Sequence, residues 1–336
     1  MTEHSENIAL VLGATGGIGG AVARGLVARG WQVMALSRNA AEARAKMPGL
    51  KWMQGDAMNA RDVMMAAEGA GLIVHAVNPP AYRDWEKLVL PMLDNTIAAA
   101  RAVGARIVLP GTVYNFGPDA FPVPSEDSPQ HPVTRKGAIR VEMEKRLEAA
   151  ARGGVPVIIV RAGDYFGPDA GNTWFAKGYV TPGKPVTSIR NPARPGVGHQ
   201  WAYLPDVAET MIALVERGDR LPPFAVFHMA GFWDDDGSRM AAAISRAAGG
   251  GVKQRGFPWW MVPLAAPFIP FMRELKEMRY LWREPLRMPN TRLVAELGRE
   301  PQTPIDEAVL KTLISLGCLP DSAAAIPHGK SMPAAG

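Results

Sequence analysis

The chain has 336 residues, of which 47% are hydrophobic, and this is enough to bury the core of one large domain or of a domain with an appended lobe. Its formal net charge of +5 suits an anionic ligand, but no dense run of Lys and Arg with interleaved aromatic residues indicates a nucleic-acid partner. The most apolar stretch, residues 257–272, contains four prolines and is shorter than the roughly 20 residues of a bilayer span. We therefore expect neither a nucleic-acid partner nor a membrane partner.

Cysteine and histidine usage argues against disulfides and metal sites. The single cysteine of the sequence, Cys318, cannot form an internal disulfide, which is compatible with a reducing cytoplasm. No Cys or His spacing is typical of a metal site, and residues 1–7 are polar and acidic rather than a charged and then apolar leader. We expect a cytoplasmic protein that acts on a small molecule and holds no metal, and the sequence leaves a homodimer open.

Residues 8–38 have the pattern of strand, glycine-rich turn, helix and strand. Residues 8–12 are apolar and partly β-branched, as in a buried parallel strand, and residues 21–29 are a predicted helix that Gly30 can end. In such a turn one glycine makes the bend, one lets backbone N–H groups approach a pyrophosphate, and one lets the helix pack closely on the strand. The helix N-terminus then faces the anion, and a structural turn without a ligand is the alternative. The predicted dinucleotide-binding residues are Gly13, Thr15, Gly16, Gly17, Ile18 and Gly19.

The end of the second strand, residues 31–36, indicates which dinucleotide binds. An acidic residue at this place would hydrogen-bond the ribose hydroxyls of NAD, whereas an arginine accommodates the 2′-phosphate of NADP. The strand is followed by Ser37 and Arg38, so NADP is predicted and NAD is the less favoured cofactor. A solvated surface position is the alternative for Arg38.

Further positions in this part of the chain are predicted to contact the cofactor. Asp56 and Ala57 follow the third strand, where an acidic side chain can reach the adenine amino group; a helix cap for the segment after Asn59 is the alternative. Two prolines after the fourth strand force the chain out of regular structure where the pyrophosphate passes. The residues expected to line that passage are Ala76, Val77 and Asn78.

The whole chain up to residue 248 alternates between strands and helices. This alternation predicts an α/β fold with a doubly wound parallel sheet, whose ligand lies at the carboxyl ends of the strands. From residue 162 onward Gly, Pro and aromatic residues become frequent, and the tail, residues 321–336, is expected to be loose. The predicted helices after the first are residues 40–46, 85–103, 134–152, 204–216 and 236–248, and the predicted strands after the second are residues 50–54, 72–76, 106–109, 155–160 and 225–229.

Several short motifs, each weak alone, occur together in a specific order: Gly13 to Gly19, Gly55-Asp56, His75-Ala76, Val113-Tyr114, and residues 161–168 and 203–208. In these motifs the chain resembles the extended short-chain dehydrogenase/reductase family, of the NAD(P)-dependent epimerase/dehydratase type. The resemblance implies a Rossmann sheet of about seven strands in residues 1–161, completed by about residues 204–230. It also implies a smaller C-terminal substrate lobe from residues 162–203 and 231–320, and cofactor contacts by Arg161 and Gly163.

The same resemblance implies a catalytic group that this sequence lacks. Family members normally carry Ser or Thr just after the fifth strand, and a Tyr that acts as acid/base and is followed four residues later by Lys. Counting from Tyr114, these positions fall on Pro110, Lys136 and Arg140, and no tyrosine lies between Tyr114 and Tyr165. The usual mechanism of the family is therefore not expected here.

The predicted helix at residues 134–152 offers a different pair of polar side chains. Lys136 and Arg140 share a stripe with apolar residues and so point inward at its N-terminal end. Two partly desolvated cations one turn apart disfavour each other's charge, and the lysine is the one that can lose a proton. We expect Lys136 to act as acid/base while Arg140 holds ribose or substrate oxygens; the alternative is that both reach solvent. Thr112 and Tyr114 would supply a further hydrogen bond or a substitute acid, unless Tyr114 is structural.

Three functions fit these residues. The first is an NADP-dependent oxidoreductase that transfers hydride to or from a small carbonyl or alcohol substrate. The second is a catalytically silent NADP-binding regulatory or redox-sensing protein, which the loss of the usual side chains favours. The third is a nucleotide-sugar epimerase or dehydratase, whose chemistry relies most heavily on the missing tyrosine. His199, Trp201 and Tyr203 are candidates for the lining of the substrate lobe, with packing as their favoured role.

Overall fold

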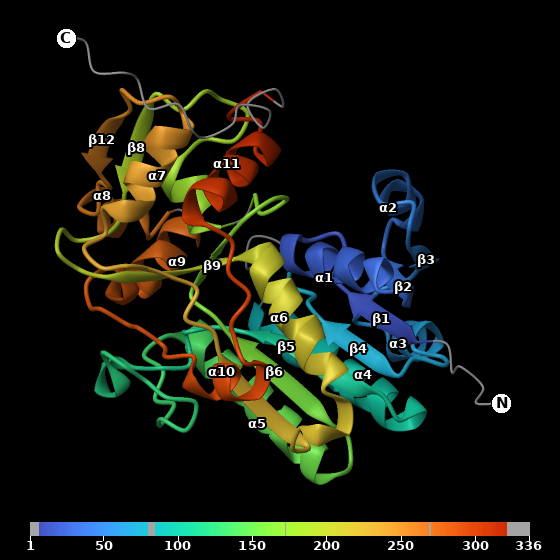
Figure 1. Ribbon diagram of the computed structural model, residues 1–336. Helices are drawn as coiled ribbons and strands as arrows, with labels where there is room; N and C mark the ends of the chain where they lie inside the picture. The colour runs from blue at the N-terminus through green and yellow to red at the C-terminus, as the bar shows by residue number, and fades with distance from the viewer. Residues whose placement is uncertain (1–6, 80–84, 172, 269, 321–336) are drawn as a thin grey trace.

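The computed structural model describes residues 7–79, 85–171, 173–268 and 270–320 (Figure 1). The tail that was predicted to be loose, residues 321–336, lies outside the described residues, as does Pro80, the second proline after the fourth strand. No helix of the described ranges is long and apolar enough to cross a membrane.

Seven strands form one parallel sheet, as the alternation of elements predicted. They are β1 (Ile8–Leu12), β2 (Gln32–Ser37), β3 (Lys51–Gln54), β4 (Leu72–His75), β5 (Arg106–Gly111), β6 (Val157–Arg161) and β10 (Phe224–His228). Their order across the sheet is β10-β6-β5-β4-β1-β2-β3, and every neighbouring pair is parallel. The direction of winding reverses at β1, which lies between β4 and β2. In open α/β sheets, ligands bind outside the carboxyl ends of the strands at such a switch point.

Helices cover both faces of this sheet. They are α1 (Gly17–Ala28), α2 (Ala40–Lys46), α3 (Ala60–Ala66), α4 (Trp85–Val103), α5 (Arg135–Arg152) and α6 (Leu204–Glu216). On one face α1 and α6 lie side by side, and Leu26 and Met211 belong to one buried cluster there (Figure 1). On the other face α3, α4 and α5 pack together, and Leu93 and Leu147 belong to a second cluster. The sheet thus has a buried apolar layer on each side, which is why its strands are almost continuously hydrophobic.

Two element boundaries near the expected site differ from the sequence prediction. Helix α1 begins at Gly17 rather than at residue 21, because the glycines that follow the turn are small enough to enter the helix where it packs on β1. Strand β5 continues through Pro110 to Gly111, and Pro110 pairs with Val160 of β6. The missing N–H of Pro110 is tolerated because the pairing of β5 with β4 ends at Val108.

The rest of the chain builds two small sheets and an aromatic core, which the sequence did not predict. The small sheets are β11 (Phe232–Asp234), β9 (His199–Tyr203) and β7 (Asp164–Phe166) in that order, and β12 (Lys253–Gly256) beside β8 (Ser188–Asn191). Phe166 and Trp201 pack edge to face at 6.2 Å in the buried cluster beneath them. The helices here are α7 (Arg239–Ala247), α8 (Met261–Ala265), α9 (Pro270–Met278), α10 (Thr291–Leu297) and α11 (Ile305–Ser315), with short helical turns at Pro118–Ala120, Phe175–Tyr179, Gly218–Arg220 and Arg279–Trp282.

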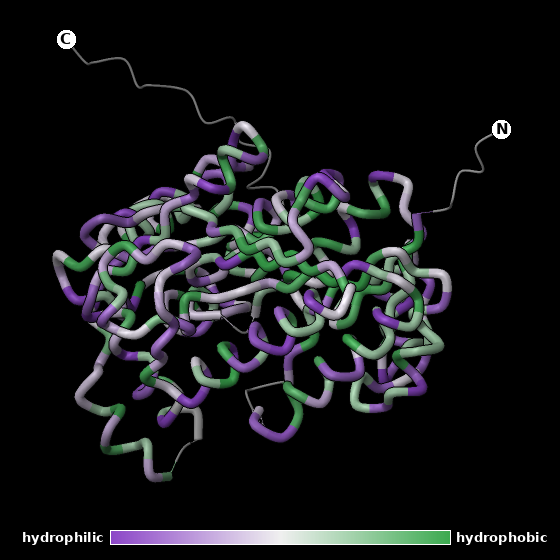
Figure 2. The backbone as a smooth tube through the Cα atoms, turned by 90° about the horizontal axis from the view of Figure 1, so that it is seen from below, coloured by the Kyte–Doolittle hydropathy of each residue, from purple (hydrophilic) through white to green (hydrophobic). Residues whose placement is uncertain are grey.

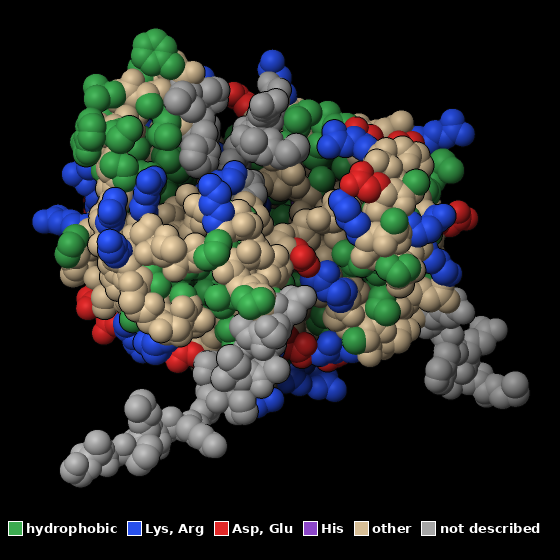
Figure 3. Space-filling view, turned by 90° about the horizontal axis from the view of Figure 1, so that it is seen from above, with side chains coloured by type: hydrophobic (Ala, Val, Ile, Leu, Met, Phe, Trp, Pro, Cys, Tyr) green, Lys and Arg blue, Asp and Glu red, His purple; other side chains and the backbone are tan. Residues whose placement is uncertain are grey.

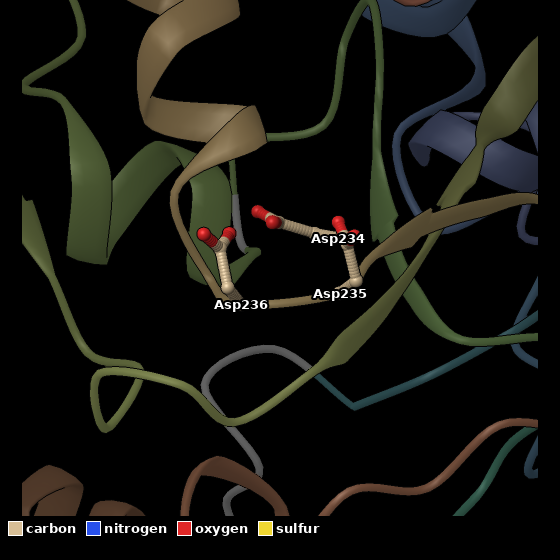
Figure 4. Close-up of side chains that lie close together, drawn as sticks. All are labelled: Asp234, Asp235 and Asp236. Atoms are coloured by element: carbon tan, nitrogen blue, oxygen red, sulfur yellow. The ribbon is translucent and has the colours of Figure 1, made fainter.

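Three consecutive aspartates lie at the end of β11, and two of them bind the start of α7 (Figure 4). Asp234 is fully buried, and its two carboxylate oxygens accept the backbone N–H groups of Arg239 and Met240 at 3.0 and 2.9 Å. Asp236 accepts the backbone N–H of Ser238 at 2.9 Å. These hydrogen bonds satisfy donors of the first turn, so α7 begins at residue 239 rather than at residue 236 as predicted.

Candidate functional site

A cavity of about 1260 Å³ lies where the chain leaves the carboxyl ends of β1, β2, β4 and β5. It spans the switch point of the sheet, the place where the fold favours a ligand. The residues predicted from the sequence that it brings together are Gly13, Thr15, Gly16, Gly17, Ile18, Ser37, Arg38, Asp56, Ala57, Ala76, Val77, Asn78, Thr112, Tyr114, Arg140 and Gly163. Three other predicted residues, Gly19, Lys136 and Arg161, are not among the described residues of the lining.

The glycine turn between β1 and α1 has three distinct environments. Gly13 has a φ of +89°, and a Cβ there would overlap the carbonyl of Ala76. A Cβ at Gly19 would overlap the carbonyl of Gly13, so this glycine lets α1 pack directly on the turn. A Cβ at Gly16 would meet Gly13 O at an ordinary 3.4 Å, and Gly16 borders the cavity. Gly16 is the N-cap of α1 and has no side chain to cap it, which leaves first-turn N–H groups for an anion.

Three cations line the end of the cavity that follows β2. Arg38 is exposed there. Arg24 pairs with Asp169 at 3.2 Å and Lys46 pairs with Glu42 at 2.6 Å, both in exposed ion pairs. Arg24 and Lys46 are thus neutralised by carboxylates, and Arg38 is the cation at this end for which the described residues show no carboxylate partner, as an anionic ligand would require.

Asp56 lines the cavity after β3. It does not cap α3, which was the alternative role considered for it. Its Oδ1 accepts the backbone N–H of Met58 at 2.9 Å. The N-cap of α3 is Asn59, whose side chain accepts the backbone N–H of Arg61 at 3.0 Å. The carboxylate of Asp56 thus belongs to the turn at the cavity and not to the helix start.

Lys136 is buried at the first turn of α5. Its side chain has 6% of its surface exposed, so the alternative in which it reaches solvent does not hold, and it is not among the described residues of the cavity lining. The first turn packs closely, since a Cβ at Gly137 would overlap the carbonyl of Tyr114. Thr134 caps this turn by accepting the N–H of Gly137 at 3.0 Å. The backbone at Tyr114 thereby limits how closely the first turn of α5 can approach β5 and the loop that follows it.

Arg140, one turn further along α5, does reach the cavity. Its Nη1 lies 3.4 Å from the carbonyl oxygen of Pro110, and its Cζ lies 5.2 Å from the ring centroid of Trp85. The Nε atom is buried without a hydrogen-bond partner among the described residues. A guanidinium held in this way over an aromatic ring keeps donors available for an oxygen ligand.

Tyr114, Asp164 and His199 form a chain of polar contacts that starts in the lining. Tyr114 Oη lies 3.5 Å from Asp164 Oδ1, and Asp164 Oδ2 lies 2.9 Å from His199 Nε2. His199 Nδ1 lies 3.3 Å from the carbonyl oxygen of Leu281, and the His199 ring stacks on Trp282 at 3.7 Å. A carbonyl only accepts, so His199 Nδ1 donates to Leu281, and this directs His199 Nε2 toward the carboxylate of Asp164.

The sequence analysis did not identify Asp164 and His199 as an interacting pair. Asp164 stands in the motif of residues 161–168, directly after β6, and a polar residue at the carboxyl end of a parallel strand was the available signal. His199 was assigned a packing role, and it does pack on Trp282. Its contact with Asp164 joins β9 to β7, two strands that a local pattern does not bring together.

Two further titratable groups in the lining are held neutral. Burial, with a smaller contribution from the nearby charge of Arg140, lowers the pKa of His75 to about 3, and His75 Nδ1 lies 2.8 Å from Thr96 Oγ1. Burial raises the pKa of Tyr165, whose hydroxyl donates to the carbonyl of Gly111 at 2.6 Å. Neither group changes its charge near neutral pH, so they shape the site and Arg140 supplies its positive charge.

Arg161 belongs to a buried ion pair rather than to the cavity, which corrects the expectation of a cofactor contact. It is 1% exposed, and its guanidinium donates to both carboxylate oxygens of Glu144 on α5, at 3.0 and 2.5 Å. Its Nη1 lies 3.1 Å from His228 Nε2 at the end of β10. Strand β6 ends at Arg161, whose side chain meets α5, and the two residues that follow, Ala162 and Gly163, line the cavity.

Comparisons with known proteins agree with this architecture. The family model described as "NAD dependent epimerase/dehydratase family" matches residues 9–230, and no curated protein matches the sequence. A UDP-galactose 4-epimerase has 17% identity and a TM-score of 0.66, with 93% of this chain and 98% of that chain covered. The UDP-glucuronic acid 4-epimerase of Bacillus cereus, in complex with NAD, has 13% identity and a TM-score of 0.72, with 92% and 96% covered. The UDP-glucose 4-epimerase of Thermotoga maritima, with UDP-glucose, has 15% identity and a TM-score of 0.71, with 92% and 98% covered.

The buried histidines make stability depend on pH. Burial is the main cause that lowers the pKa of both His75 and His228 to about 3, whereas an unfolded histidine titrates near 6.5. The unfolded chain therefore binds more protons as pH falls from about 6.5 to about 3, and each histidine lowers the free energy of unfolding by up to about 1.4 kcal/mol per pH unit there. Urea unfolding between pH 7 and pH 4 measures this slope. His75→Gln should make the slope shallower than in the native protein; equal slopes in the two proteins would contradict the assignment.

Proposed function

This chain belongs to the NAD-dependent epimerase/dehydratase family, and we propose that it is an NADP-dependent oxidoreductase of the short-chain dehydrogenase/reductase type. In this proposal it transfers hydride to or from a small carbonyl or alcohol substrate. The observation that carries the proposal is that one cavity joins the glycine turn at Gly16 to Arg140, Tyr114 and Asp164. An anion site and a group of proton-bearing side chains at opposite ends of one cavity are what a dinucleotide-dependent hydride transfer needs.

The lining fits a nicotinamide dinucleotide. The uncapped first turn of α1 accommodates a pyrophosphate beside Gly16, and the carboxylate of Asp56 suits an adenine amino group. The structurally similar Bacillus cereus epimerase is a complex with NAD. For this chain we propose NADP, because Arg38 lines the cavity after β2, where its guanidinium suits a 2′-phosphate.

Tyr114 takes the acid/base role that the sequence analysis gave to Lys136. A bound nicotinamide supplies or accepts the hydride at the substrate carbon. In the direction of carbonyl reduction, Tyr114 Oη donates its proton to the substrate oxygen, and the proton held by Asp164 and His199 replaces it. Arg140 binds the substrate or ribose oxygen, and Thr112 accepts the backbone N–H of Tyr114 at 3.3 Å and so positions it. The 3.5 Å contact between Tyr114 and Asp164 is of the kind that tightens when substrate binds.

Two other functions compete with this one. A nucleotide-sugar epimerase has a diphosphate to bind beyond the dinucleotide, yet at the Tyr114 end the cation among the described lining residues is Arg140, and Asp164 adds a carboxylate to the same lining. This favours an uncharged substrate. A catalytically silent NADP-binding regulator is favoured by the occupation of the usual catalytic positions by Pro110, Lys136 and Arg140. A screen of aldehydes, ketones and alcohols with NADP and NADPH separates the enzyme from the regulator.

The glycine turn gives the first test. Gly16→Val should abolish dinucleotide binding, because the side chain enters the space of the pyrophosphate, and the fold should survive, because a Cβ there meets ordinary contacts. Gly19→Ala is the matched control for packing, since its Cβ overlaps backbone, and should lower the thermal midpoint. Calorimetry measures binding and circular dichroism measures unfolding. Native affinity in Gly16→Val would place the phosphates elsewhere.

Cofactor choice gives the second test. Arg38→Ala should weaken NADP binding by about 1.5 to 3 kcal/mol, the range of a charge-assisted hydrogen bond, and leave NAD binding nearly unchanged. Titration calorimetry with both dinucleotides measures this, and Arg61→Ala is a control on an exposed arginine of α3 that does not line the cavity. Equal affinity of the native protein for NAD and NADP would contradict the assignment of NADP as the cofactor.

The acid/base gives the third test. Tyr114→Phe should slow hydride transfer by a factor of about 10² to 10⁴ and leave NADP affinity unchanged, because it removes the reacting proton alone. Lys136→Met should lower thermal stability and keep most of the rate per folded molecule, since Lys136 is buried outside the lining. Single-turnover kinetics with NADPH measure both. A full rate in Tyr114→Phe would remove Tyr114 from the mechanism.

A further inference from the structure

The segment of residues 257–268, here called the apolar wedge, exposes large hydrophobic side chains to solvent. Trp260 is 70% exposed, Leu264 67% and Phe268 84%, and Met261 is 48% exposed. Figure 2 shows the backbone of the part of the molecule that holds α8 projecting from the body at the lower left. Soluble surfaces rarely carry large apolar side chains gathered in this way without a partner.

Aromatic packing holds the first residues of the apolar wedge in place. Phe257 and Trp259 pack against Trp174, with ring centroids 6.2 and 6.0 Å apart, and Trp174 is also a wall of the cavity. Trp259 Nε1 donates to the carbonyl of Pro192 at 2.8 Å, and Val262 is buried. The exposed side chains of the apolar wedge are therefore attached to a backbone that aromatic packing holds in place.

The surroundings of the wedge are basic. No Asp or Glu occurs in the sequence between Asp236 and Glu274. Lys253 and Arg255 are exposed on β12, which leads into the wedge, and Arg273 is exposed on α9 after it. Figure 3 shows hydrophobic side chains gathered at the upper left corner, over the part of the molecule that holds β12 and α8, with Lys and Arg side chains beside them.

We propose that the apolar wedge inserts into the interface of an anionic lipid bilayer while Lys253, Arg255 and Arg273 contact its headgroups. A short element with Trp, Leu and Phe on one side and Lys and Arg around it has the chemistry of an interfacial anchor, in which apolar side chains enter the headgroup and acyl boundary. The sequence analysis expected no membrane partner because it found no segment that could span a bilayer. Interfacial binding needs no spanning helix, so that argument does not apply to it. The proposal is independent of the catalytic activity.

A second copy of the chain fits the wedge less well. In a symmetric pair each wedge meets the same surface of the other chain, which brings the lysine and arginine side chains that flank both wedges together. Like charges that approach in this way oppose the contact, whereas anionic headgroups neutralise them. The charge around the wedge therefore selects the bilayer.

Sedimentation of the full-length protein with lipid vesicles tests the proposal. The native chain should bind vesicles of phosphatidylglycerol and phosphatidylcholine, and bind pure phosphatidylcholine at least about tenfold more weakly. Leu264→Glu and Phe268→Glu should each lower binding to the anionic vesicles by about tenfold or more, because a charge replaces an inserted apolar side chain. Val133→Glu, at a position that is 58% exposed elsewhere on the surface, is the matched control and should bind as the native chain does.

The flanking charges give a second variant that does not touch the apolar side chains. Lys253→Glu combined with Arg255→Glu should weaken binding to anionic vesicles by about tenfold and remove its preference over phosphatidylcholine. Vesicle binding by the native chain that Leu264→Glu leaves unchanged would overturn the proposal, as would no binding at all. Light scattering that finds a dimer which Leu264→Glu dissolves, without vesicle binding, would assign the wedge to a second copy instead.

Discussion

The contact between the backbone of Gly19 and the carbonyl of Gly13 is the constraint on which the site depends. A Cβ at Gly19 would overlap that carbonyl, so only glycine lets α1 approach β1 this closely. The approach aims the uncapped N-terminus of α1 into the cavity and brings Gly16 to its wall. At Gly13 a φ of +89° and the nearby carbonyl of Ala76 place β4 beside the same turn. The anion site that we propose here thus rests on backbone geometry alone.

The opposite end of the cavity depends on buried charge instead. The guanidinium of Arg161 is tied to Glu144, and this ion pair joins the end of β6 to α5. The carboxylate and the arginine are both almost fully buried, and breaking such a pair costs several kcal/mol because one charge is left without its partner. Helix α5 is therefore held at two points. The ion pair ties Glu144 to β6, and the backbone at Tyr114 packs against Gly137 in the first turn. Between these two contacts Arg140 is presented to the cavity.

Sequence periodicity placed Lys136 and Arg140 on one inward face of α5, and both are turned inward. It could not tell which of the two would reach a ligand, because a helical stripe says which side of a helix is buried and not what covers it. The backbone at Tyr114 packs against the first turn, where Lys136 is buried, and one turn later Arg140 borders the cavity. Arg161 illustrates the same limit, since its place in the motif did not reveal that the side chain turns toward Glu144.

The sequence by itself determined the elements of the seven-stranded sheet and the glycine turn between β1 and α1, because strand and helix periods, glycine turns and caps are properties of neighbouring residues. Helices α2, α4 and α6 begin and end at the predicted residues. Tertiary structure alone decided the pairing of Asp164 with His199, the burial of Lys136 and the seating of Trp259 on Trp174. Each of these joins segments that are far apart along the chain or depends on the depth at which one element packs on another. Such contacts leave no local period in the sequence, so only the folded chain reveals them.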